Sequence, residues 1–491
     1  ADYFLGGRDA TWLAIGASIF ASNIGSEHLI GLAGAGASSG MAMAHWEIQG
    51  WMILILGWVF VPFYTRSMVY TMPEFLERRY NPQSRTILSV ISLVSYVLTK
   101  VAVTVYAGGL VFQQVFGIKE LWGIDFFWIA AIGLVVLTAL YTIFGGMKSV
   151  LYTSVLQTPI LLLGSLIILV LGFKELGGWD EMMRVCGAVT VNNYGDTMTN
   201  LIRSNDDANF PWLGALIGSA IIGFWYWCTD QFIVQRVLSG KNEMEARRGT
   251  IFGAYLKLLP VFLFLIPGMI AFALHQKYIG AGGEGFLPML ANGTANADAA
   301  FPTLVAKLLP AGVKGLVVCG ILAALMSSLA SLFNSSAMLF TIDFYKRFRP
   351  ETPEKKLVGI GQVATVVIVI LGILWIPIMR SVGDVLYTYL QDVQSVLAPG
   401  IAAAFLLGIC WKRTSAQGGM WGLIAGMVIG LTRLGAKVYY SNAGEVADST
   451  FKYLFYDMNW LFFCGWMFLF CIIVVIVVSL ATEAPTAEKI Q

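Results

Sequence analysis

Charged residues are scarce in this sequence. Only 12% of its 491 residues are Asp, Glu, Lys or Arg, whereas a soluble globular protein carries about 25%. Hydrophobic residues make up 57% of the chain and the mean hydropathy is +0.74, which excludes a disordered protein. A net charge of +2 gives no indication of a nucleic-acid partner. Since so little polar surface cannot cover a water-soluble body of this size, we expect lipid to surround most of the chain.

Cysteine and histidine are scarce as well. The six cysteines show no paired spacing of the kind that holds zinc or builds a disulfide framework. The three histidines, His28, His45 and His275, come without a zinc or acyl-transfer motif. An enzyme is therefore not expected, nor an organic cofactor. No cleavable signal peptide is expected either, because residues 1–8 are polar and the first apolar run contains Glu27 and His28.

Long apolar runs recur along the whole chain. A bilayer core about 30 Å thick needs roughly 20 apolar residues per helix. A backbone in lipid must satisfy its own hydrogen bonds, so these continuous runs predict an all-α multi-pass membrane protein. The predicted spans are 12–38, 45–64, 87–116, 125–144, 149–172, 211–238, 250–275, 312–345, 357–379, 384–410, 415–435 and 459–481.

Basic residues follow every second span. Arg78 follows the second span, Lys148 follows the fourth, Arg247 closes the sixth, Arg347 follows the eighth and Lys412 follows the tenth. The connections between these are mixed or acidic. Because positively charged loops stay on the cytoplasmic side, the alternation predicts that residue 1 lies in the cytoplasm. The expected location is the plasma membrane.

Polar groups interrupt the first and the sixth span. Residues 21–28 read Ala-Ser-Asn-Ile-Gly-Ser-Glu-His, and residues 223–231 read Gly-Phe-Trp-Tyr-Trp-Cys-Thr-Asp-Gln. At membrane depth such segments predict broken helices whose freed carbonyls and amides line a cavity. Two breaks five helices apart are typical of an inverted-repeat transporter with its site between the halves. A kinked packing helix and an interfacial aromatic belt are the alternatives, but a belt does not explain Asp230 and Gln231.

Three further polar residues lie inside apolar runs, namely Glu47, Lys257 and Gln391. The opposite charges of Glu47 and Lys257 offset each other's burial if both side chains face one cavity. Such groups beside aromatic rings suit a neutral polyhydroxylated ligand, because hydroxyls donate and accept while the C–H face of a sugar stacks on a ring. For any single residue, an ordinary interhelical hydrogen bond remains an alternative.

Hydroxyl groups form a narrow stripe in the eighth span. Ser327, Ser328 and Ser331 recur at helical spacing. A hard monovalent cation prefers uncharged carbonyl and hydroxyl oxygens. Carbonyls from the break near Ala21 and Ile24, together with the serine hydroxyls, would form such a site, although helix packing alone also uses serine.

These motifs resemble the sodium/solute symporter family, and most of all its sodium/glucose cotransporter branch. The similar stretches are 20–28, 71–75, 141–146, 225–236, 327–334 and 405–413. The resemblance implies a single transmembrane domain over 1–491 with a LeuT-like, five-plus-five inverted-repeat core. Its expected parts are a first repeat at 12–175, a second repeat at 211–410 and peripheral helices at 415–481. The additional helices usual in the family, one before the first span and one at the C-terminus, have no counterpart here, which fits either trimming or disorder.

The resemblance also implies roles for individual residues. The expected sodium ligands are carbonyls and hydroxyls of Ala21, Ile24, Ala324, Ser327 and Ser328. The expected solute contacts are Asn23, His28, Glu47, Tyr226, Trp227, Lys257 and Gln391. The expected gates, with Tyr226 on the inner side and the others on the outer side, are Tyr226, Leu32, Trp46 and Tyr387.

The activity implied by the resemblance is sodium-coupled import of a neutral hexose, similar to glucose or galactose, by alternating access. Ser154 stands where many members carry Asp, and Ala330 offers no hydroxyl, so one sodium ion per sugar is predicted. Myo-inositol or another small solute is the alternative. A sodium-conducting channel or a sensor would belong to a different class, but the sequence shows neither a repeated filter loop nor a signalling domain.

Overall fold

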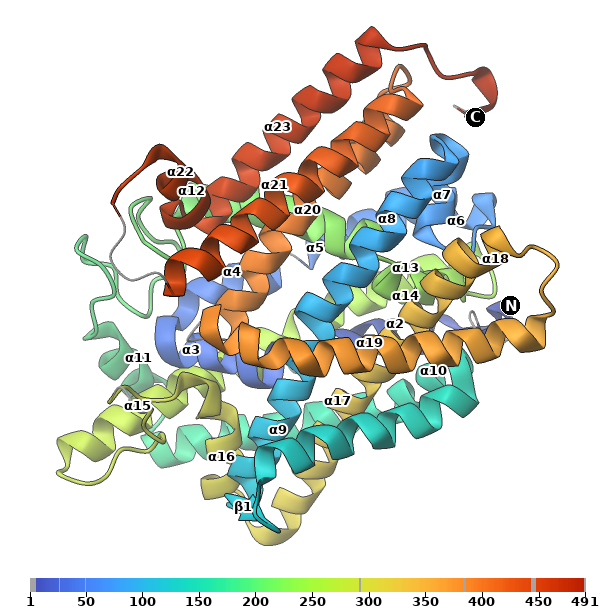
Figure 1. Cartoon of the computed structure of the whole chain (residues 1–491). Coiled ribbons are helices and arrows are strands. Elements are labelled where there is room, and N and C mark those ends of the chain that lie inside the picture. Colours follow the sequence, from blue (N-terminus) through green and yellow to red (C-terminus); the bar gives the residue numbers. More distant parts are fainter. Residues whose placement is uncertain are drawn as a thin grey trace.

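The computed structural model is almost entirely helical (Figure 1). It describes the residues in six ranges, which are 6–25, 27–48, 50–290, 293–382, 386–442 and 447–489. Within these ranges, ten helices are long and apolar enough to cross a membrane, and Trp12–Asn23 and Phe126–Leu140 form two shorter apolar helices. The predicted spans overlap these helices, although the first span, 12–38, covers Trp12–Asn23 and the beginning of Glu27–Ser67, which also contains the second span. The prediction of a multi-pass helical protein is confirmed.

The first part of the chain contains the elements that carry the first predicted break. In chain order they are η1 (Gly6–Arg8), α2 (Trp12–Asn23), η2 (Glu27–Leu32), α3 (Ala33–Ser39), η3 (Gly40–Met43), α4 (Ala44–Ile48), α5 (Trp51–Ile55), η4 (Leu56–Phe60), α6 (Val61–Ser67), α7 (Met72–Arg79), α8 (Pro82–Ser95), η5 (Tyr96–Val101), α9 (Ala102–Phe116), β1 (Glu120–Leu121), β2 (Ile124–Asp125), α10 (Phe126–Leu176) and α11 (Trp179–Gly187). The two short strands pair in antiparallel fashion.

The second part carries the second break and ends in two long helices. In chain order its elements are α12 (Trp212–Gly223), η6 (Phe224–Thr229), α13 (Gln231–Leu238), α14 (Glu243–Leu256), η7 (Val261–Leu265), α15 (Ile266–Gly280), η8 (Ala297–Ala299), α16 (Ala300–Leu308), α17 (Ala311–Met338), η9 (Leu339–Tyr345), α18 (Lys346–Phe348), α19 (Glu354–Val382), α20 (Leu386–Cys410), α21 (Ala416–Asn442), α22 (Thr450–Lys452), η10 (Tyr453–Asp457), α23 (Trp460–Ala481) and η11 (Ala487–Lys489).

Helix α10 contains two predicted spans, 125–144 and 149–172, in one run of 51 residues. The predicted connection between them is therefore helical and not a loop. The two ends of α10 have different partners. Phe126 lies against Phe116 of α9, with ring centroids 6.2 Å apart, whereas the carbonyl of Leu176 accepts a hydrogen bond from Lys277 of α15 at 3.0 Å.

Both predicted breaks are present. Helix α2 ends at Asn23, and Ile24 leaves the helical conformation with φ −83° and ψ 83°. The second break follows η6, where Asp230 is extended with φ −76° and ψ 128°. The Asp230 carboxylate accepts a hydrogen bond from the Phe232 amide at 3.1 Å and so caps the next helix, α13.

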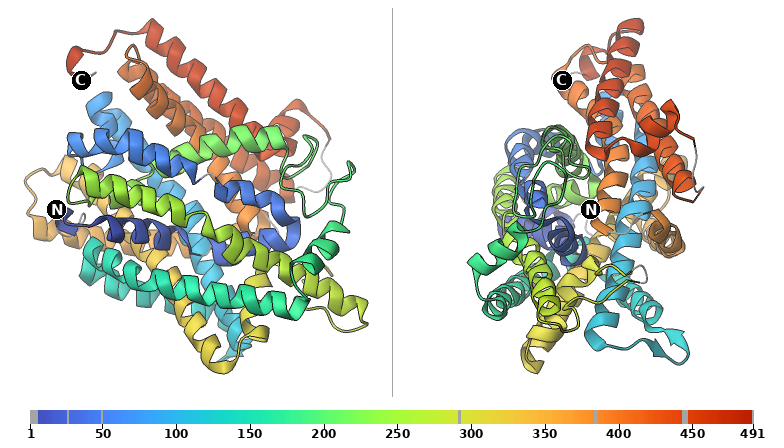
Figure 2. Two further views of the ribbon diagram at one scale, coloured as in Figure 1. Left: turned by 180° about the vertical axis from the view of Figure 1, so that it is seen from behind. Right: turned by 90° about the vertical axis from the view of Figure 1, so that its left-hand side faces the viewer.

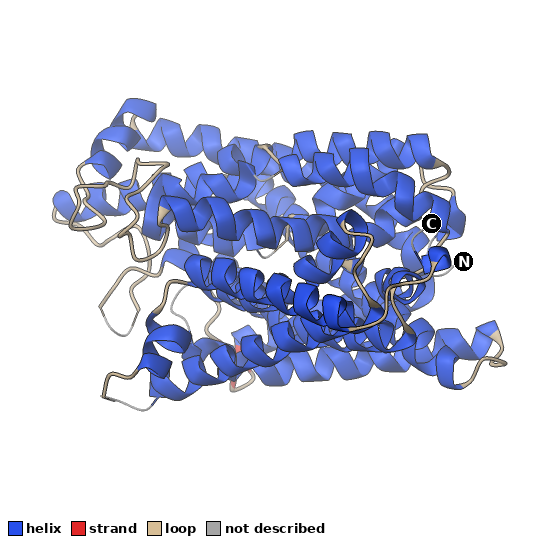
Figure 3. Ribbon diagram, turned by 90° about the horizontal axis from the view of Figure 1, so that it is seen from above, coloured by secondary structure: helices blue, strands red, loops and turns tan. Residues whose placement is uncertain are grey.

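The basic connections gather at one end of the bundle, which we call the basic end. It includes residues 67–85, 240–248 and 343–349. The described parts of both termini lie there too (Figure 3). Arg8 donates to the carbonyl of Val69 at 3.1 Å, and near the C-terminus the Lys489 ammonium donates to a backbone carbonyl of α7 at 3.0 Å. Three of the basic connections that alternate along the sequence therefore lie together in the structure.

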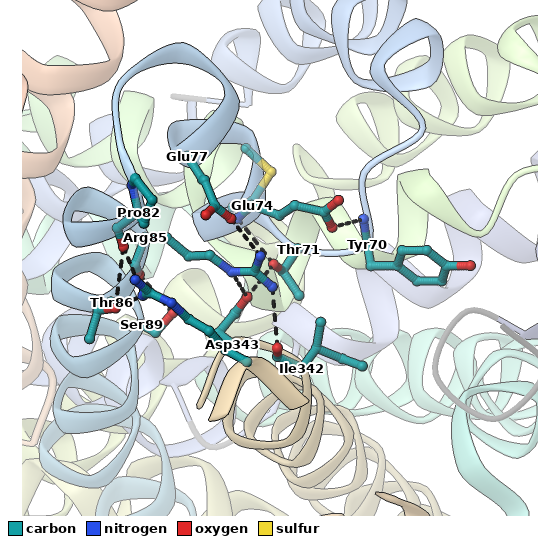
Figure 4. Close-up of polar contacts among 12 residues, drawn as sticks. Tyr70, Thr71, Glu74, Glu77, Pro82, Arg85, Thr86, Ser89, Ile342 and Asp343 are labelled. Atoms are coloured by element: carbon teal, nitrogen blue, oxygen red, sulfur yellow. Dashed lines mark hydrogen bonds and ion pairs between the residues drawn. The ribbon is translucent and has the colours of Figure 1, made fainter. Parts of the chain in front are cut away.

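An ion-pair cluster joins α7, α8 and η9 at the basic end (Figure 4). The Asp343 side chain is fully buried, and it accepts hydrogen bonds from Arg85 Nε at 2.7 Å and from Thr71 Oγ1 at 3.0 Å. The same guanidinium contacts Glu77 Oε2 at 2.6 Å and the carbonyl of Ile342 at 3.2 Å. The cluster ties the end of the long helix α17, continued by η9, to the hairpin of α7 and α8.

Helices α20, α21 and α23 pack closely along one side of the bundle (Figure 2). Gly426 of α21 faces Gly400 of α20 so closely that a Cβ on Gly426 would lie 2.6 Å from the Gly400 Cα. A larger residue at either position would force the helices apart, so glycine is required for this contact.

Candidate functional site

A cavity lies between the two broken helices. Its walls come from the break after α2, from α4, from α12 with η6, from the end of α14 and from α20. All seven predicted solute contacts line this one cavity, namely Asn23, His28, Glu47, Tyr226, Trp227, Lys257 and Gln391. Residues that lie far apart in the sequence thus converge at the interrupted helices, as expected for a binding site of this kind.

A buried charged cluster forms one wall of the cavity. Lys257, directly after α14, lies 2.6 Å from Glu47 Oε2, 2.8 Å from His28 Nε2 and 2.8 Å from Asn23 Oδ1. Glu47 is fully buried, so its charge depends on the ammonium group. Since an ammonium only donates, His28 Nε2 accepts from Lys257, and the same nitrogen lies 3.3 Å from Glu47 Oε2. The predicted pairing of Glu47 with Lys257 is confirmed.

Aromatic rings form a second wall. Tyr226 and Trp227 of η6 meet edge to face with centroids 4.9 Å apart. The Asn23 amide donates to the Tyr226 hydroxyl at 2.9 Å and so fixes that ring against the break in α2. Trp46, which also lines the cavity, packs on Trp460 at 5.4 Å. These rings offer apolar faces on which the C–H face of a ring-shaped solute can stack.

Several polar atoms of the cavity residues lack a protein partner. Among the described residues, Glu47 Oε1, Gln391 Oε1 and His28 Nδ1 are buried without a hydrogen bond. Leaving such a group unsatisfied costs about 1–3 kcal/mol. Three unsatisfied polar atoms in the residues of one cavity therefore favour a ligand that supplies their hydrogen-bond partners and removes this cost.

Two polar wall residues were not predicted as solute contacts. Glu27 belongs to the broken segment, directly before His28, and its polar character at membrane depth was the available signal. Gln394 lies one helical turn after Gln391 in α20 and therefore shares its face. The three-residue spacing from Gln391 was the only feature of the sequence that could have indicated Gln394 as a cavity residue.

The predicted gate residues have different placements. Trp46 and Tyr226 line the cavity. Leu32 is fully buried at the end of η2 and is not part of the cavity wall. The side chain of Tyr387 lies outside the described part of the structure. The gate roles therefore stay predictions.

A second, smaller cavity lies where the break in α2 meets α17. Ser328 Oγ donates to the carbonyl of Ser22 at 3.0 Å, and the hydroxyls of Ser22 and Ser331 are 2.8 Å apart. Gly25 permits this approach, because a Cβ there would collide with Ser328 Oγ. Asn23 and Glu27 line this cavity as well as the larger one, so the two cavities share a wall.

The other predicted sodium ligands lie in the same region. Ala21 and Ile24 are buried on the α2 side of the break, and Ala324 and Ser327 are buried on the facing side of α17. A Cβ on Gly25 would lie 3.9 Å from the Ala324 carbonyl oxygen. Within the described ranges, no three His, Cys, Asp or Glu side chains are grouped for a metal. The oxygen donors at the break are hydroxyls and carbonyls, which suit sodium.

Lys100 was not anticipated. It is 4% exposed and lines the smaller cavity. Its ammonium lies 2.8 Å from Asp230 Oδ2 and 3.8 Å from the centre of the Phe232 ring, while Tyr96 donates to Asp230 Oδ1 at 2.6 Å. Asp230 is therefore held by a cation and a hydroxyl. Gln231, its neighbour, accepts a hydrogen bond from the backbone amide of Met72 at 2.8 Å.

Comparison with known proteins shows which family the chain belongs to. A model of the sodium:solute symporter family matches residues 3–426. The chain belongs to this family. The symporter is 37% identical over 502 residues to human sodium/myo-inositol cotransporter 2, covering 100% of this chain and 73% of that protein. It is also 37% identical over 503 residues to sodium/glucose cotransporter 4 of Danio rerio, covering 99% and 75%.

Solved structures share the fold of this symporter. A substrate-bound, outward-open Na⁺-coupled sialic acid symporter superposes with a TM-score of 0.74 at 21% identity, covering 99% of this chain and 93% of that one. Mhp1, a nucleobase-cation-symport-1 family transporter, gives a TM-score of 0.55 at 13% identity, covering 99% and 96%. The LeuT-like five-plus-five core with two further C-terminal helices is therefore confirmed. The protein is a sodium-coupled solute symporter of the membrane.

Proposed function

We propose that the symporter imports a neutral, polyhydroxylated six-membered ring together with one sodium ion. The observation that carries this proposal is the larger cavity. It combines the Lys257 cluster and three unsatisfied polar atoms with the faces of Tyr226 and Trp227. Hydroxyl groups both donate and accept, and the C–H face of a ring stacks on an aromatic face, so each wall has a counterpart in such a solute.

Two solute classes meet this description. A hexose similar to glucose or galactose is the first candidate from the sequence, and myo-inositol is the second. The names of the relatives favour both, since proteins named for myo-inositol and for glucose cotransport match at the same identity of 37%. Both rings carry neighbouring hydroxyls, which are donors of the kind that the unpaired oxygens of Glu47 and Gln391 lack.

Sodium binding is proposed where α2 breaks against α17. The proposed ligands are Ala21, Ile24, Ala324, Ser327 and Ser328. An ion at this place would hold the break against α17 and thereby fix Asn23, which lines both cavities. Asn23 in turn contacts Lys257 and Tyr226. Sodium would thus complete the solute cavity, and by linkage the solute would tighten sodium binding by the same factor.

The proposed stoichiometry is one sodium ion per solute. Ala330 lacks a hydroxyl for a second ion, and the side chain of Ser154 lies outside the described part. A neutral solute then moves with one net charge. A potential of 100 mV contributes about 2.3 kcal/mol, and a tenfold sodium gradient adds about 1.4 kcal/mol. Together these drive accumulation of the solute by a factor of about 500.

The orientation and the gates follow from the same proposal. The basic end would face the cytoplasm of a plasma membrane. Trp46, Leu32 and Tyr387 would close the cavity toward the outside, and Tyr226 would close it toward the inside. The repeats at 12–175 and 211–410 would rock against each other, with 415–481 as a peripheral support.

Uptake into proteoliposomes tests this function. With an inward sodium gradient, labelled glucose or myo-inositol is expected to accumulate and to be competed by a panel of sugars and inositols. Gln391→Ala is expected to weaken uptake about tenfold, whereas Gln113→Ala, at the far end of α9, leaves it unchanged. Sodium current without solute uptake would instead identify a channel, and sodium binding without any flux would identify a sensor.

A further inference from the structure

Glu27 lines both the larger and the smaller cavity. Within the described ranges it forms no ion pair and no hydrogen bond with another side chain. The two other carboxylates of the region are both held by lysines: Glu47 lies 2.6 Å from Lys257, and Asp230 lies 2.8 Å from Lys100. Glu27 interacts with these two lysines only through space.

This arrangement does not suit a purely structural residue. A carboxylate at membrane depth costs several kcal/mol unless it is paired or faces a polar partner. Glu27 begins η2, directly after the break, and the residue is half-buried. Because Lys100 and Lys257 are each in contact with another carboxylate, Glu27 is the carboxylate of the larger cavity that has no cation in contact.

The chemistry of the available oxygens restricts that ligand. An ionised carboxylate only accepts hydrogen bonds. Glu47 Oε1 is a second unpaired acceptor in the same cavity. A solute that satisfies both must present hydroxyl hydrogens at two separate parts of its ring. A cyclitol carries a hydroxyl on every ring carbon, whereas one ring position of a pyranose is an oxygen without hydrogen, which would face an acceptor unfavourably.

We propose that Glu27 is a specificity-determining residue that accepts hydrogen bonds from two neighbouring hydroxyls of a cyclitol and so favours it over a pyranose hexose. This inference rests on the proposed function, since it requires a polyhydroxylated solute in the larger cavity. It adds a preference between the two solute classes and assigns it to one side chain.

Paired uptake measurements on the whole chain in proteoliposomes test the proposal. The probes are labelled myo-inositol and labelled glucose, each under an inward sodium gradient. Glu27→Gln keeps the shape of the side chain but removes its charge, and Glu284→Gln, in an exposed loop, is the matched control. A hydrogen bond to a charged group corresponds to a factor of about ten or more in affinity.

The expected result is a loss of at least about tenfold in Vmax/KM for myo-inositol in Glu27→Gln, with a change below about threefold for glucose. Retained sodium-driven glucose uptake shows that the variant is folded. Equal losses for both solutes, or a wild-type preference for glucose, would overturn the proposal while leaving sodium-coupled transport in place. Absence of sodium-driven uptake of either solute by the wild type would instead refute the proposed function itself.

A second measurement uses only the wild-type chain and so does not depend on the folding of a variant. Deoxy-inositols, each lacking one hydroxyl, compete with labelled myo-inositol uptake. The proposal predicts that loss of either of two neighbouring hydroxyls weakens competition about tenfold. If every deoxy position is equivalent, no carboxylate selects a pair of hydroxyls and the proposal is wrong.

Discussion

Replacing Lys257 by Met removes the centre of the buried charged cluster while keeping most of the side-chain volume. The ammonium contacts Glu47, His28 and Asn23 at 2.6–2.8 Å. Without it, the fully buried Glu47 carboxylate keeps only the contact of its Oε2 with His28 Nε2, at 3.3 Å. Breaking one half of a buried ion pair costs about 3–5 kcal/mol. We therefore expect Lys257→Met to lower the free energy of unfolding by this amount and to abolish solute binding.

The measurement is the free energy of unfolding in detergent micelles, followed by tryptophan fluorescence during titration with sodium dodecyl sulfate. Glu47→Gln combined with Lys257→Met removes both charges at once. This double variant is expected to be more stable than the sum of the two single losses implies, by about 2 kcal/mol. Lys355→Met, at an exposed position, is the matched control and should stay within about 0.5 kcal/mol of the wild type.

Strict additivity of the two single losses would refute the reasoning. It would mean that Glu47 and Lys257 do not stabilise each other in the folded protein, and that the cavity wall is held together by other contacts. If Lys257→Met were as stable as the wild type, the conclusion would be the same, because an unpaired buried carboxylate destabilises the folded protein.

Three further predictions concern other parts of the symporter. Ser328→Ala is expected to raise the sodium concentration for half-maximal uptake about tenfold, whereas Ser336→Ala in the same helix should leave it unchanged; equal effects would remove Ser328 from the ion site. Arg85→Ala strands the buried Asp343 carboxylate and should destabilise the micellar protein by about 3–5 kcal/mol, unless Asp343→Asn accompanies it. Burial raises the pKa of Cys186 to about 12, so this thiol stays protonated at pH 8, and maleimide labelling before unfolding would contradict that burial.

Much of the fold could be predicted because a membrane span has a clear physical signature. The length and apolarity of a segment determine whether it crosses the membrane as a helix. Polar residues within such an apolar segment mark the breaks. Ala21 to His28 and Gly223 to Gln231 were recognisable as interruptions for this reason, and both are interrupted in the structure. The connection inside α10 was less predictable, since its two glycines at 145 and 146 do not end the helix.

The site could be predicted only in part, because the sequence does not give the rotation of each helix or its distant partners. Glu47 and Lys257 were recognisable from their opposite charge at membrane depth. Glu27 was harder, because a break removes the helical period that normally assigns a residue to a face. Lys100 and Asp230 are 130 residues apart in the chain, and no local pattern indicates that they form an ion pair.

Equilibrium binding by the purified symporter tests the central claim most directly, namely that one broken segment serves both the ion and the solute. The dissociation constant of labelled myo-inositol or glucose is measured in sodium and in choline, and that of sodium is measured with and without the solute. The account predicts that sodium tightens solute binding and that the solute tightens sodium binding by the same factor. A solute affinity that is unchanged when choline replaces sodium would contradict it.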